Sequence, residues 1–130
     1  MLDHIGIQAE DVTASARFYD AVLAPLGARR WLEFEGGQVI SFGTEAPGNF
    51  WVSPVPEELR GTSGRENHLA FTAPDRAAVD AFHAAALAVG AESLHAPRLW
   101  PEYHASYYGA FVRDPDGNNV EAVCHLPSPS

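Results

Sequence analysis

The sequence predicts an α+β fold built from two βαβββ repeats. Residues 3–9 and residues 66–73 each alternate between apolar and polar side chains, as half-buried strands do, and a helical pattern follows each of them. His4 and His68 hold the same position in the two segments, with an offset of 64 residues. A period this long that occurs only twice indicates two similar units sharing one core, because solenoid repeats are shorter and more numerous.

In the first repeat, Asp11 is expected to cap a helix that ends at Gly27. Apolar side chains recur between these two residues at the spacing of one helical face. Glycine and proline residues then divide the chain into short extended segments. The strands expected in them span residues 28–34, 38–43 and 49–53.

In the second repeat, Pro74 and Asp75 are expected to open a helix that ends at Gly90. Residues 96–106 are expected to form a loop that carries several aromatic side chains. The strands expected around this loop span residues 92–95, 108–113 and 118–124.

The chain of 130 residues is expected to form one domain, residues 1–130. Its expected parts are a first repeat over about residues 2–54, a linker over 55–65, a second repeat over about 66–125 and a tail over 126–130.

Composition limits the partners that the protein can have. Hydrophobic residues make up 46% and charged residues 19%, and no apolar run approaches the ~20 residues of a membrane span. The net charge of −9, with only 8 Lys and Arg residues, argues against nucleic acid and is compatible with a divalent cation. A single cysteine, Cys124, excludes an internal disulfide, so a cytoplasmic location is expected.

The end of the second repeat contains an unusual carboxylate. Asp114-Pro-Asp-Gly117 has the residues of a tight turn, so the segments on either side are expected to pair as a hairpin. Glu121 then interrupts the apolar run of the second strand. Its side chain is expected either to lie at a solvated edge or to bind a ligand.

Three residues are candidates for a metal site. His4 and His68 face away from the apolar side of their strands, and Glu121 would complete a set of two imidazoles and one carboxylate. Such a set binds divalent transition metals and leaves coordination positions open for substrate. The same residues also fit a protein without metal, with two hydrogen-bonded histidines in the sheet and a glutamate at its edge.

The doubled βαβββ pattern, the histidine in the first strand of each unit and the ending Asp114-Pro-Asp-Gly-Asn-Asn-Val-Glu121 resemble the vicinal oxygen chelate superfamily. This group includes glyoxalases, bleomycin-resistance proteins, fosfomycin-resistance enzymes and extradiol dioxygenases, and the resemblance covers about residues 2–125. It implies a curled mixed sheet around a metal-binding cleft, as in glyoxalases and dioxygenases, and a homodimer. It also implies that His4, His68 and Glu121 bind a divalent ion, which could be Fe, Mn, Ni, Co or Zn.

Two positions depart from the better-known members of the superfamily. Aligning the last strands of the two repeats puts Trp51 where glyoxalase I usually has a fourth ligand, and tryptophan cannot bind a metal. His104 fits the histidine of the extradiol dioxygenase signature, but Phe111 stands where that signature has tyrosine. A tyrosine from nearby, Tyr107 or Tyr108, is a possible replacement.

Catalysis needs a titratable group beside the metal ligands, and His104 and Tyr107 are the candidates. Residues 100–108 are expected to form an aromatic lid or wall, while His83, His95 and His125 are expected to be solvated. The opposite wall of the cleft is expected to consist of aromatic side chains of the first repeat, namely Trp31, Phe34, Phe42, Phe50 and Trp51.

Two classes of function remain open. One is a metal-dependent lyase, isomerase or dioxygenase that acts on a small molecule with vicinal oxygens. The other is a non-catalytic protein that sequesters an aromatic or drug-like ligand, as bleomycin-resistance proteins do. The histidine and glutamate set favours the enzyme, while the net charge of −9 and the aromatic content fit the binding protein.

Overall fold

The computed structural model describes residues 1–62 and 64–128. The order of its elements is βαβββ followed by βαβββ, as the sequence predicts. The strands are β1 (Ile5–Ala9), β2 (Arg29–Phe34), β3 (Val39–Gly43), β4 (Phe50–Pro54), β5 (His68–Thr72), β6 (Ser93–Leu99), β7 (Tyr108–Arg113) and β8 (Asn119–Cys124). The helices are α1 (Val12–Leu23) and α2 (Arg76–Ala88), with short 3-10 turns at Ala24–Leu26, Glu35–Gly37 and Glu57–Leu59.

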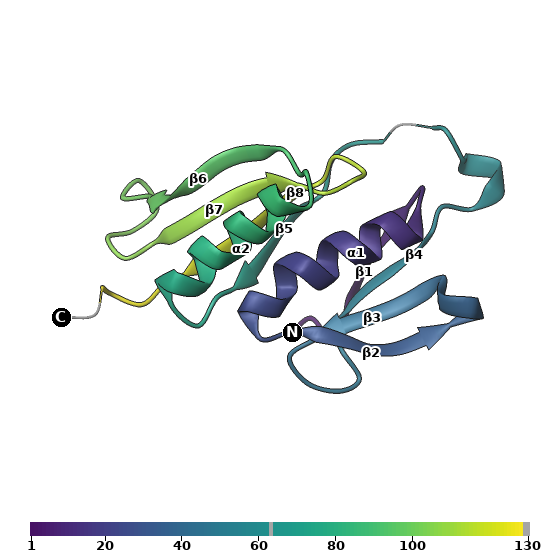
Figure 1. Cartoon of the computed structure of the whole chain (residues 1–130), viewed down its shortest axis with the longest axis horizontal. Helices are drawn as coiled ribbons and strands as arrows, with labels where there is room; N and C mark the ends of the chain where they lie inside the picture. Colours follow the sequence, from purple (N-terminus) through teal and green to yellow (C-terminus); the bar gives the residue numbers. More distant parts are fainter. Residues whose placement is uncertain (63, 129–130) are drawn as a thin grey trace.

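Each repeat forms its own four-stranded mixed sheet (Figure 1). The strand order is β1-β4-β3-β2 in the first unit and β5-β8-β7-β6 in the second. In both units the first strand runs parallel to the last, and the other pairs are antiparallel. The α+β class and the doubled βαβββ arrangement are therefore confirmed.

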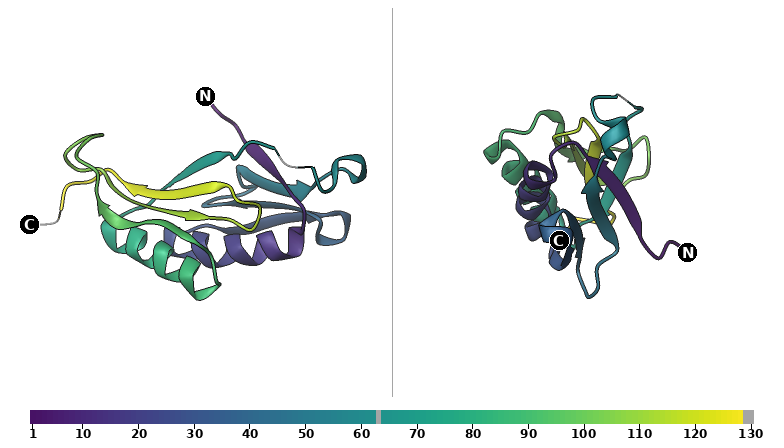
Figure 2. Two further views of the ribbon diagram at one scale, coloured as in Figure 1. Left: turned by 90° about the horizontal axis from the view of Figure 1, so that it is seen from above. Right: turned by 90° about the vertical axis from the view of Figure 1, so that its right-hand side faces the viewer.

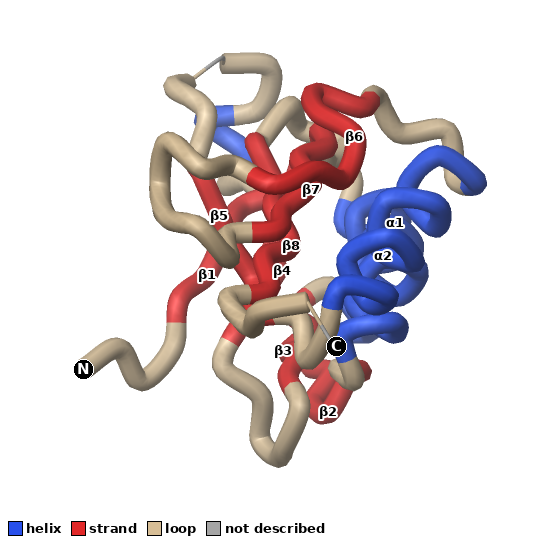
Figure 3. The backbone as a smooth tube through the Cα atoms, turned by 90° about the vertical axis from the view of Figure 1, so that its left-hand side faces the viewer, coloured by secondary structure: helices blue, strands red, loops and turns tan. Residues whose placement is uncertain are grey.

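Both helices lie on the same side of the strands, and they pack against each other where the two units meet (Figures 2 and 3). One continuous cluster of buried apolar side chains contains residues of both units, among them Tyr19, Phe42, Phe82 and Val120. The opposite face of the strands carries no helix, so each sheet is left with an open face. Of the predicted site residues, His68 on β5 and Glu121 on β8 lie on the open face of the second sheet, because their strand neighbours Leu69 and Val120 face the core.

The local signals for the helices are confirmed. Asp11 and Asp75 are the N-caps, and their carboxylates accept hydrogen bonds from the backbone N–H groups of Ala14 and Ala78. The segment that contains α1 ends at Gly27, whose φ of 84° lies in the left-handed region that favours glycine.

The strand β6 is longer than predicted. A strand was expected over residues 92–95 with a loop from 96, but β6 continues to Leu99 and includes Pro97. Proline cannot donate a hydrogen bond to a sheet, but β6 is an edge strand with a neighbour only on the β7 side. The register between β6 and β7 also shifts twice, so the missing donor is tolerated.

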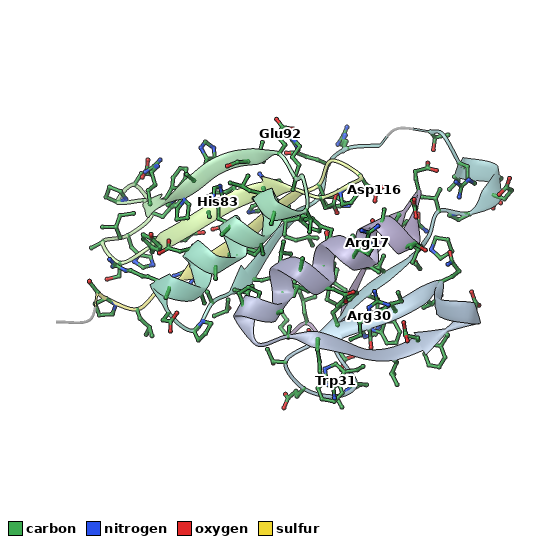
Figure 4. The ribbon with its side chains drawn as sticks, in the orientation of Figure 1. Arg17, Arg30, Trp31, His83, Glu92 and Asp116 are labelled. Carbon is green, nitrogen blue, oxygen red and sulfur yellow. The ribbon has the colours of Figure 1, made fainter. Side chains whose placement is uncertain are left out.

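The hairpin between β7 and β8 is confirmed and has a second role. Gly117 has a φ of 86°, and its N–H donates to the carbonyl of Asp114 across the turn. The two carboxylates of this turn bind the first unit: Asp116 accepts from the backbone N–H of Glu10 and from the hydroxyl of Ser15, and Asp114 accepts from the hydroxyl of Tyr19 at 2.6 Å. Figure 4 shows Asp116 beside α1. The turn therefore fastens the second unit to the first.

No helix within the described residues is long and apolar enough to cross a membrane. The expected linker over 55–65 includes residue 63, and the expected tail over 126–130 includes residues 129 and 130. These three residues lie outside the part of the chain that the structure describes.

Candidate metal centre

Glu121 is buried in the middle of a sheet. It lies on β8, between β5 and β7, and its side chain is only 3% exposed. One carboxylate oxygen, Oε1, lies 3.0 Å from Nε2 of His68, and the other, Oε2, accepts a hydrogen bond from the hydroxyl of Tyr107. A buried carboxylate is costly unless both of its oxygens are bonded, and these two partners meet that need.

The hydroxyl of Tyr107 is held in its protonated form. Burial raises the pKa of Tyr107 well above its usual value, and the hydrogen bond to the Glu121 carboxylate raises it further. Tyr107 is thus a hydrogen-bond donor near neutral pH, and it does not act as a base there.

Phe111 lies next to Glu121. The two residues pair in the register of β7 and β8, and the Phe111 ring is roughly parallel to the imidazole of His68, with ring centroids 6.0 Å apart. Phe111 therefore places an apolar ring at the site. The hydroxyl that reaches the carboxylate comes from Tyr107, whereas the hydroxyl of Tyr108 donates to Asp80 on α2. Of the two possible replacements for the missing tyrosine, only Tyr107 contacts Glu121.

His104 is close to Tyr107 and does not contact Glu121. Its Nδ1 accepts a hydrogen bond from the backbone N–H of Ser106, so the ring proton is on Nε2. Nε2 lies 2.9 Å from Nδ1 of His125 and donates to it. The rings of both histidines meet Tyr107 edge-on, at centroid distances of 5.5 and 5.2 Å.

Sequence reasoning did not connect His125 with this cluster. It is exposed, as expected, but it forms a pair with His104. The signal was available in the hairpin, because the register that pairs Tyr108 with Cys124 puts Tyr107 opposite His125. His95 is also exposed, and its ring packs edge-on against Phe111 at 5.5 Å. His83 lies on α2 and bonds to Ser93.

His4 lies apart from the other predicted ligands. Its side chain is 61% exposed, and its Nδ1 lies 2.6 Å from a carboxylate oxygen of Asp3. Figure 2 shows that the N-terminal segment projects from the molecule on the side away from the helices. Within the described residues, no group of three His, Cys, Asp or Glu side chains is close enough to hold a metal ion. Within one chain, His68 and Glu121 therefore lie together, and His4 lies elsewhere.

The strand register gives the alignment of the two units. Trp51 pairs with Gly6 on β1, and Glu121 pairs with Ala70 on β5. Gly6 and Ala70 are equivalent under the same offset that relates His4 to His68. Trp51 therefore occupies the position of Glu121 in the first unit, as the sequence alignment predicts.

The expected aromatic walls are only partly correct. Phe42 and Phe50 are buried in the core beneath the helices, because their side chains point to the face opposite Trp51. Phe34 and Trp51 lie together on the open face. In the segment expected to form a lid, Trp100 is buried and donates to the carbonyl of Gly109.

The donors present at Glu121 suit a divalent metal. An imidazole nitrogen and a carboxylate oxygen 3.0 Å apart can take neighbouring positions around one ion. The hydroxyl of Tyr107 donates to the remaining carboxylate oxygen of Glu121, and it would fix the orientation of that carboxylate if Oε1 bound an ion.

Comparisons with known proteins agree with this fold. The family model described as "Glyoxalase/Bleomycin resistance protein/Dioxygenase superfamily" matches residues 1–122. A glyoxalase/bleomycin resistance protein from Albidiferax ferrireducens T118 has 28% identity and a TM-score of 0.78, over 95% of this chain and 97% of that one. No curated protein matches the chain.

Two further solved structures are similar. A lactoylglutathione lyase from Agrobacterium tumefaciens is 25% identical, with a TM-score of 0.67 over 93% of this chain and 90% of that one. A putative glyoxalase from Bacillus halodurans is 22% identical, with a TM-score of 0.75 over 95% of each chain, and shows likeness of fold alone. Since the family model covers nearly the whole sequence, the chain belongs to the glyoxalase/bleomycin resistance protein/dioxygenase superfamily.

Proposed function

We propose that the protein is a divalent-metal-dependent enzyme that acts on a small molecule through two vicinal oxygen atoms. The reaction would be that of a lyase, an isomerase or a dioxygenase. The observation that carries the proposal is the convergence of His68 and Tyr107 on the buried carboxylate of Glu121, on a face of the sheet that no helix covers.

In this proposal His4, His68 and Glu121 are the protein ligands of the ion. The ion would supply Lewis-acid stabilisation of negative charge on the substrate oxygens. Nε2 of His68 donates to Glu121 in the chain alone, so this proton must leave when a metal binds. Tyr107 keeps its own proton and continues to hold the other carboxylate oxygen.

Because one chain separates His4 from the other two ligands, we assign His4 of a second copy to each site. The Asp3 carboxylate beside Nδ1 of His4 supports this role, since it holds the proton on that nitrogen and leaves Nε2 free for a metal. The first strand of each unit lies at the edge of its sheet, so β1 of one copy can approach β5 of another. The protein is thus proposed to be a homodimer whose sites are shared.

Proton transfer is assigned to the cluster around Tyr107. Its hydroxyl donates hydrogen bonds near neutral pH, so the base must be another group. His104 is the nearest candidate, with its ring proton on Nε2 and its Nδ1 bonded to the backbone N–H of Ser106. In the proposed reaction Tyr107 steadies Glu121. His104 would take up a proton at Nδ1 once its hydrogen bond to Ser106 opens, while its Nε2–H stays bonded to His125, and it would then return the proton to the substrate.

The test is the metal content of the dialysed protein. Wild type is expected to retain about one ion per chain, and His68→Ala and Glu121→Gln less than about a tenth of that. His83→Ala is the matched control, because His83 lies on α2 in the same unit and, among the residues described, its side chain bonds to Ser93 and not to Glu121. Equal metal content in all four proteins, or none in the wild type, would contradict the metal-dependent proposal.

A non-catalytic binding protein is the alternative. The observation in its favour is that Glu121 has a partner on each oxygen without any metal. In that case the wild type would bind no metal, and the acidic chain, with its net charge of −9, would favour cationic aromatic ligands. In either case we place the protein in the cytoplasm, with a small molecule as its partner and without nucleic acid or membrane binding.

A further inference from the structure

The open face of the first unit carries two parallel aromatic rings. Phe34 on β2 and Trp51 on β4 have ring centroids 6.1 Å apart and ring planes 8° apart. Phe34 is 51% exposed, although large aromatic side chains are usually buried. The pair is therefore available to a planar ligand, in contrast to the aromatic side chains of the core.

The residues beside Trp51 in the sheet are small. Trp51 pairs with Gly6 on β1 and with Ser41 on β3. Gly6 has no side chain, and the hydroxyl of Ser41 donates a hydrogen bond to the carbonyl of Pro47. Neither neighbouring strand places a bulky side chain against the indole.

The other two tryptophans are covered by cations of the chain itself. The guanidinium of Arg29 lies 3.4 Å from the ring centroid of Trp31, and that of Arg98 lies 3.3 Å from that of Trp100. Within the described residues, no guanidinium covers Trp51 in this way. Trp51 is half-buried, and its ring has Phe34 as a neighbour and no cation of the chain over it.

The position of Trp51 relates the pair to the proposed metal site. Trp51 stands in the first unit where Glu121 stands in the second, and its strand neighbour Gly6 is two residues from His4. If His4 completes the site, the aromatic pair comes with it to the same cleft. We infer that Phe34 and Trp51 form a subsite for a planar aromatic ring, so that the substrate carries such a ring next to its two vicinal oxygens. The location of this subsite rests on the proposed function.

Two probes separate ring recognition from chelation. 2,3-Dihydroxynaphthalene has vicinal oxygens on a planar aromatic body, and cis-1,2-cyclohexanediol has vicinal oxygens without one. Trp51→Leu and Phe34→Leu are each expected to weaken the binding of dihydroxynaphthalene about tenfold, because ring stacking is lost. The affinity for the cyclohexanediol and the metal content are expected to stay at wild-type values.

Trp31→Leu is the matched control, because it removes an indole of the same unit that Arg29 already covers. Figure 4 shows Trp31 at the end of the first unit. Its affinity for dihydroxynaphthalene is expected to equal that of the wild type, and the thermal midpoints of all variants are compared. Equal binding of the naphthalene probe by the wild type, Trp51→Leu and Phe34→Leu would overturn the subsite. The subsite would also be overturned if Trp51→Leu and Phe34→Leu changed only the dissociation constant of the dimer. That result would mean that a second copy of the chain covers the two rings.

These binding experiments distinguish a failure of the aromatic subsite from a failure of the proposed metal site. If the wild type binds no metal but binds the naphthalene probe more tightly than Trp51→Leu does, the metal site would be refuted and the aromatic subsite supported. A metal-loaded wild type whose naphthalene binding does not depend on Trp51 would do the reverse.

Discussion

At the scale of single residues, Glu121 is a buried carboxylate whose stability depends on the hydrogen bonds that its two oxygens accept. An ionised carboxylate in the middle of a sheet loses its water, and burial without partners costs several kcal/mol. His68 and Tyr107 each bond one oxygen of the group. A metal would replace His68 as the partner of Oε1, while Tyr107 would stay on Oε2. Tyr107 would therefore keep the carboxylate in one orientation with or without a metal.

Tyr107→Phe tests this positioning role. The variant keeps the ring but leaves Oε2 of Glu121 without its donor, so the carboxylate can rotate away from the metal position. We expect about 10- to 100-fold weaker metal affinity with unchanged stoichiometry, measured by competition with a chelator of known affinity.

Tyr108→Phe is the natural control for this experiment. It removes a hydroxyl from the next residue, but that hydroxyl bonds to Asp80 on α2. Its metal affinity is expected to match the wild type. Equal losses in the two variants would show that general destabilisation, and not the bond to Glu121, lowers the affinity.

That His68 and Glu121 lie together was predictable from the sequence, because strand alternation and the repeat put them on the same face of the sheet. The pair of His104 and His125 was not predicted. Those residues are 21 positions apart, and His104 lies in an irregular segment with no periodicity to follow. Only the hairpin register places His125 opposite Tyr107.

At the scale of elements, the turn between β7 and β8 does more than reverse the chain. Asp114 accepts from the backbone N–H groups of Asp116 and Asn118 and from the hydroxyl of Tyr19. Burial and the charge of Asp114 raise the pKa of Tyr19 well above its usual value, so this hydroxyl remains a donor. The same residues that form the turn therefore lock the second unit against α1. This fixes the position of β8, and with it Glu121.

The packing of α2 on β7 gives a prediction that depends on pH. Burial and the hydrogen bond to Asp80 raise the pKa of Tyr108 to about 12. Since the pKa is near 10 in the unfolded chain, the stabilisation is complete below about pH 10 and is lost as the pH rises toward 12. Tyr108→Phe is expected to lower the free energy of unfolding by about 1 kcal/mol at pH 8, because a charged partner loses its donor at a partly exposed site.

At pH 11 the gap between wild type and Tyr108→Phe is expected to shrink by about 1 kcal/mol, because Tyr108 is ionised in the unfolded chain while the folded state still keeps its proton. Urea unfolding at the two pH values measures both gaps. Tyr103→Phe is the comparison variant, since Tyr103 is 60% exposed, and no gap is expected at either pH. A gap for Tyr108→Phe that is constant or grows with pH would contradict the assigned cause.

Elements with local signals were the easiest to predict. The caps Asp11 and Asp75 fixed the starts of both helices. The length of β6 was missed, because Pro97 reads as a strand breaker unless the strand is known to lie at an edge, and edge position is a tertiary property. Phe50 and Trp51 were assigned to one wall, although neighbours in a strand must face opposite ways.

At the scale of the whole molecule, the helix-free face of each sheet is left uncovered within one chain (Figure 3), and His4 lies apart from His68 and Glu121. The helices and the turn between β7 and β8 hold the units together. Within the described residues, β1 and β5 each have a partner strand on one side and an unpaired outer edge on the other. The unpaired backbone N–H and C=O groups of an exposed strand edge can form hydrogen bonds with a strand of another chain. Ile5, at the start of β1, is 45% exposed and would be buried by such a contact. A second copy would cover the edges and bring His4 to Glu121.

A mixing experiment tests the shared site directly. In a dimer of this kind each site takes His4 from one copy and His68 with Glu121 from the other. His4→Ala and His68→Ala alone should bind almost no metal, and both proteins should still have twice the chain mass of 14.0 kDa by light scattering. When the two variants are unfolded together and refolded, half of the dimers are mixed, and each mixed dimer regains one intact site with both histidines. Metal is therefore expected at about one site in four of the mixture. Refolding each variant separately controls for recovery and should restore no metal. If all three ligands came from one chain, the mixture would bind no more metal than its parents, so an unchanged metal content in a confirmed heterodimer would exclude the shared site.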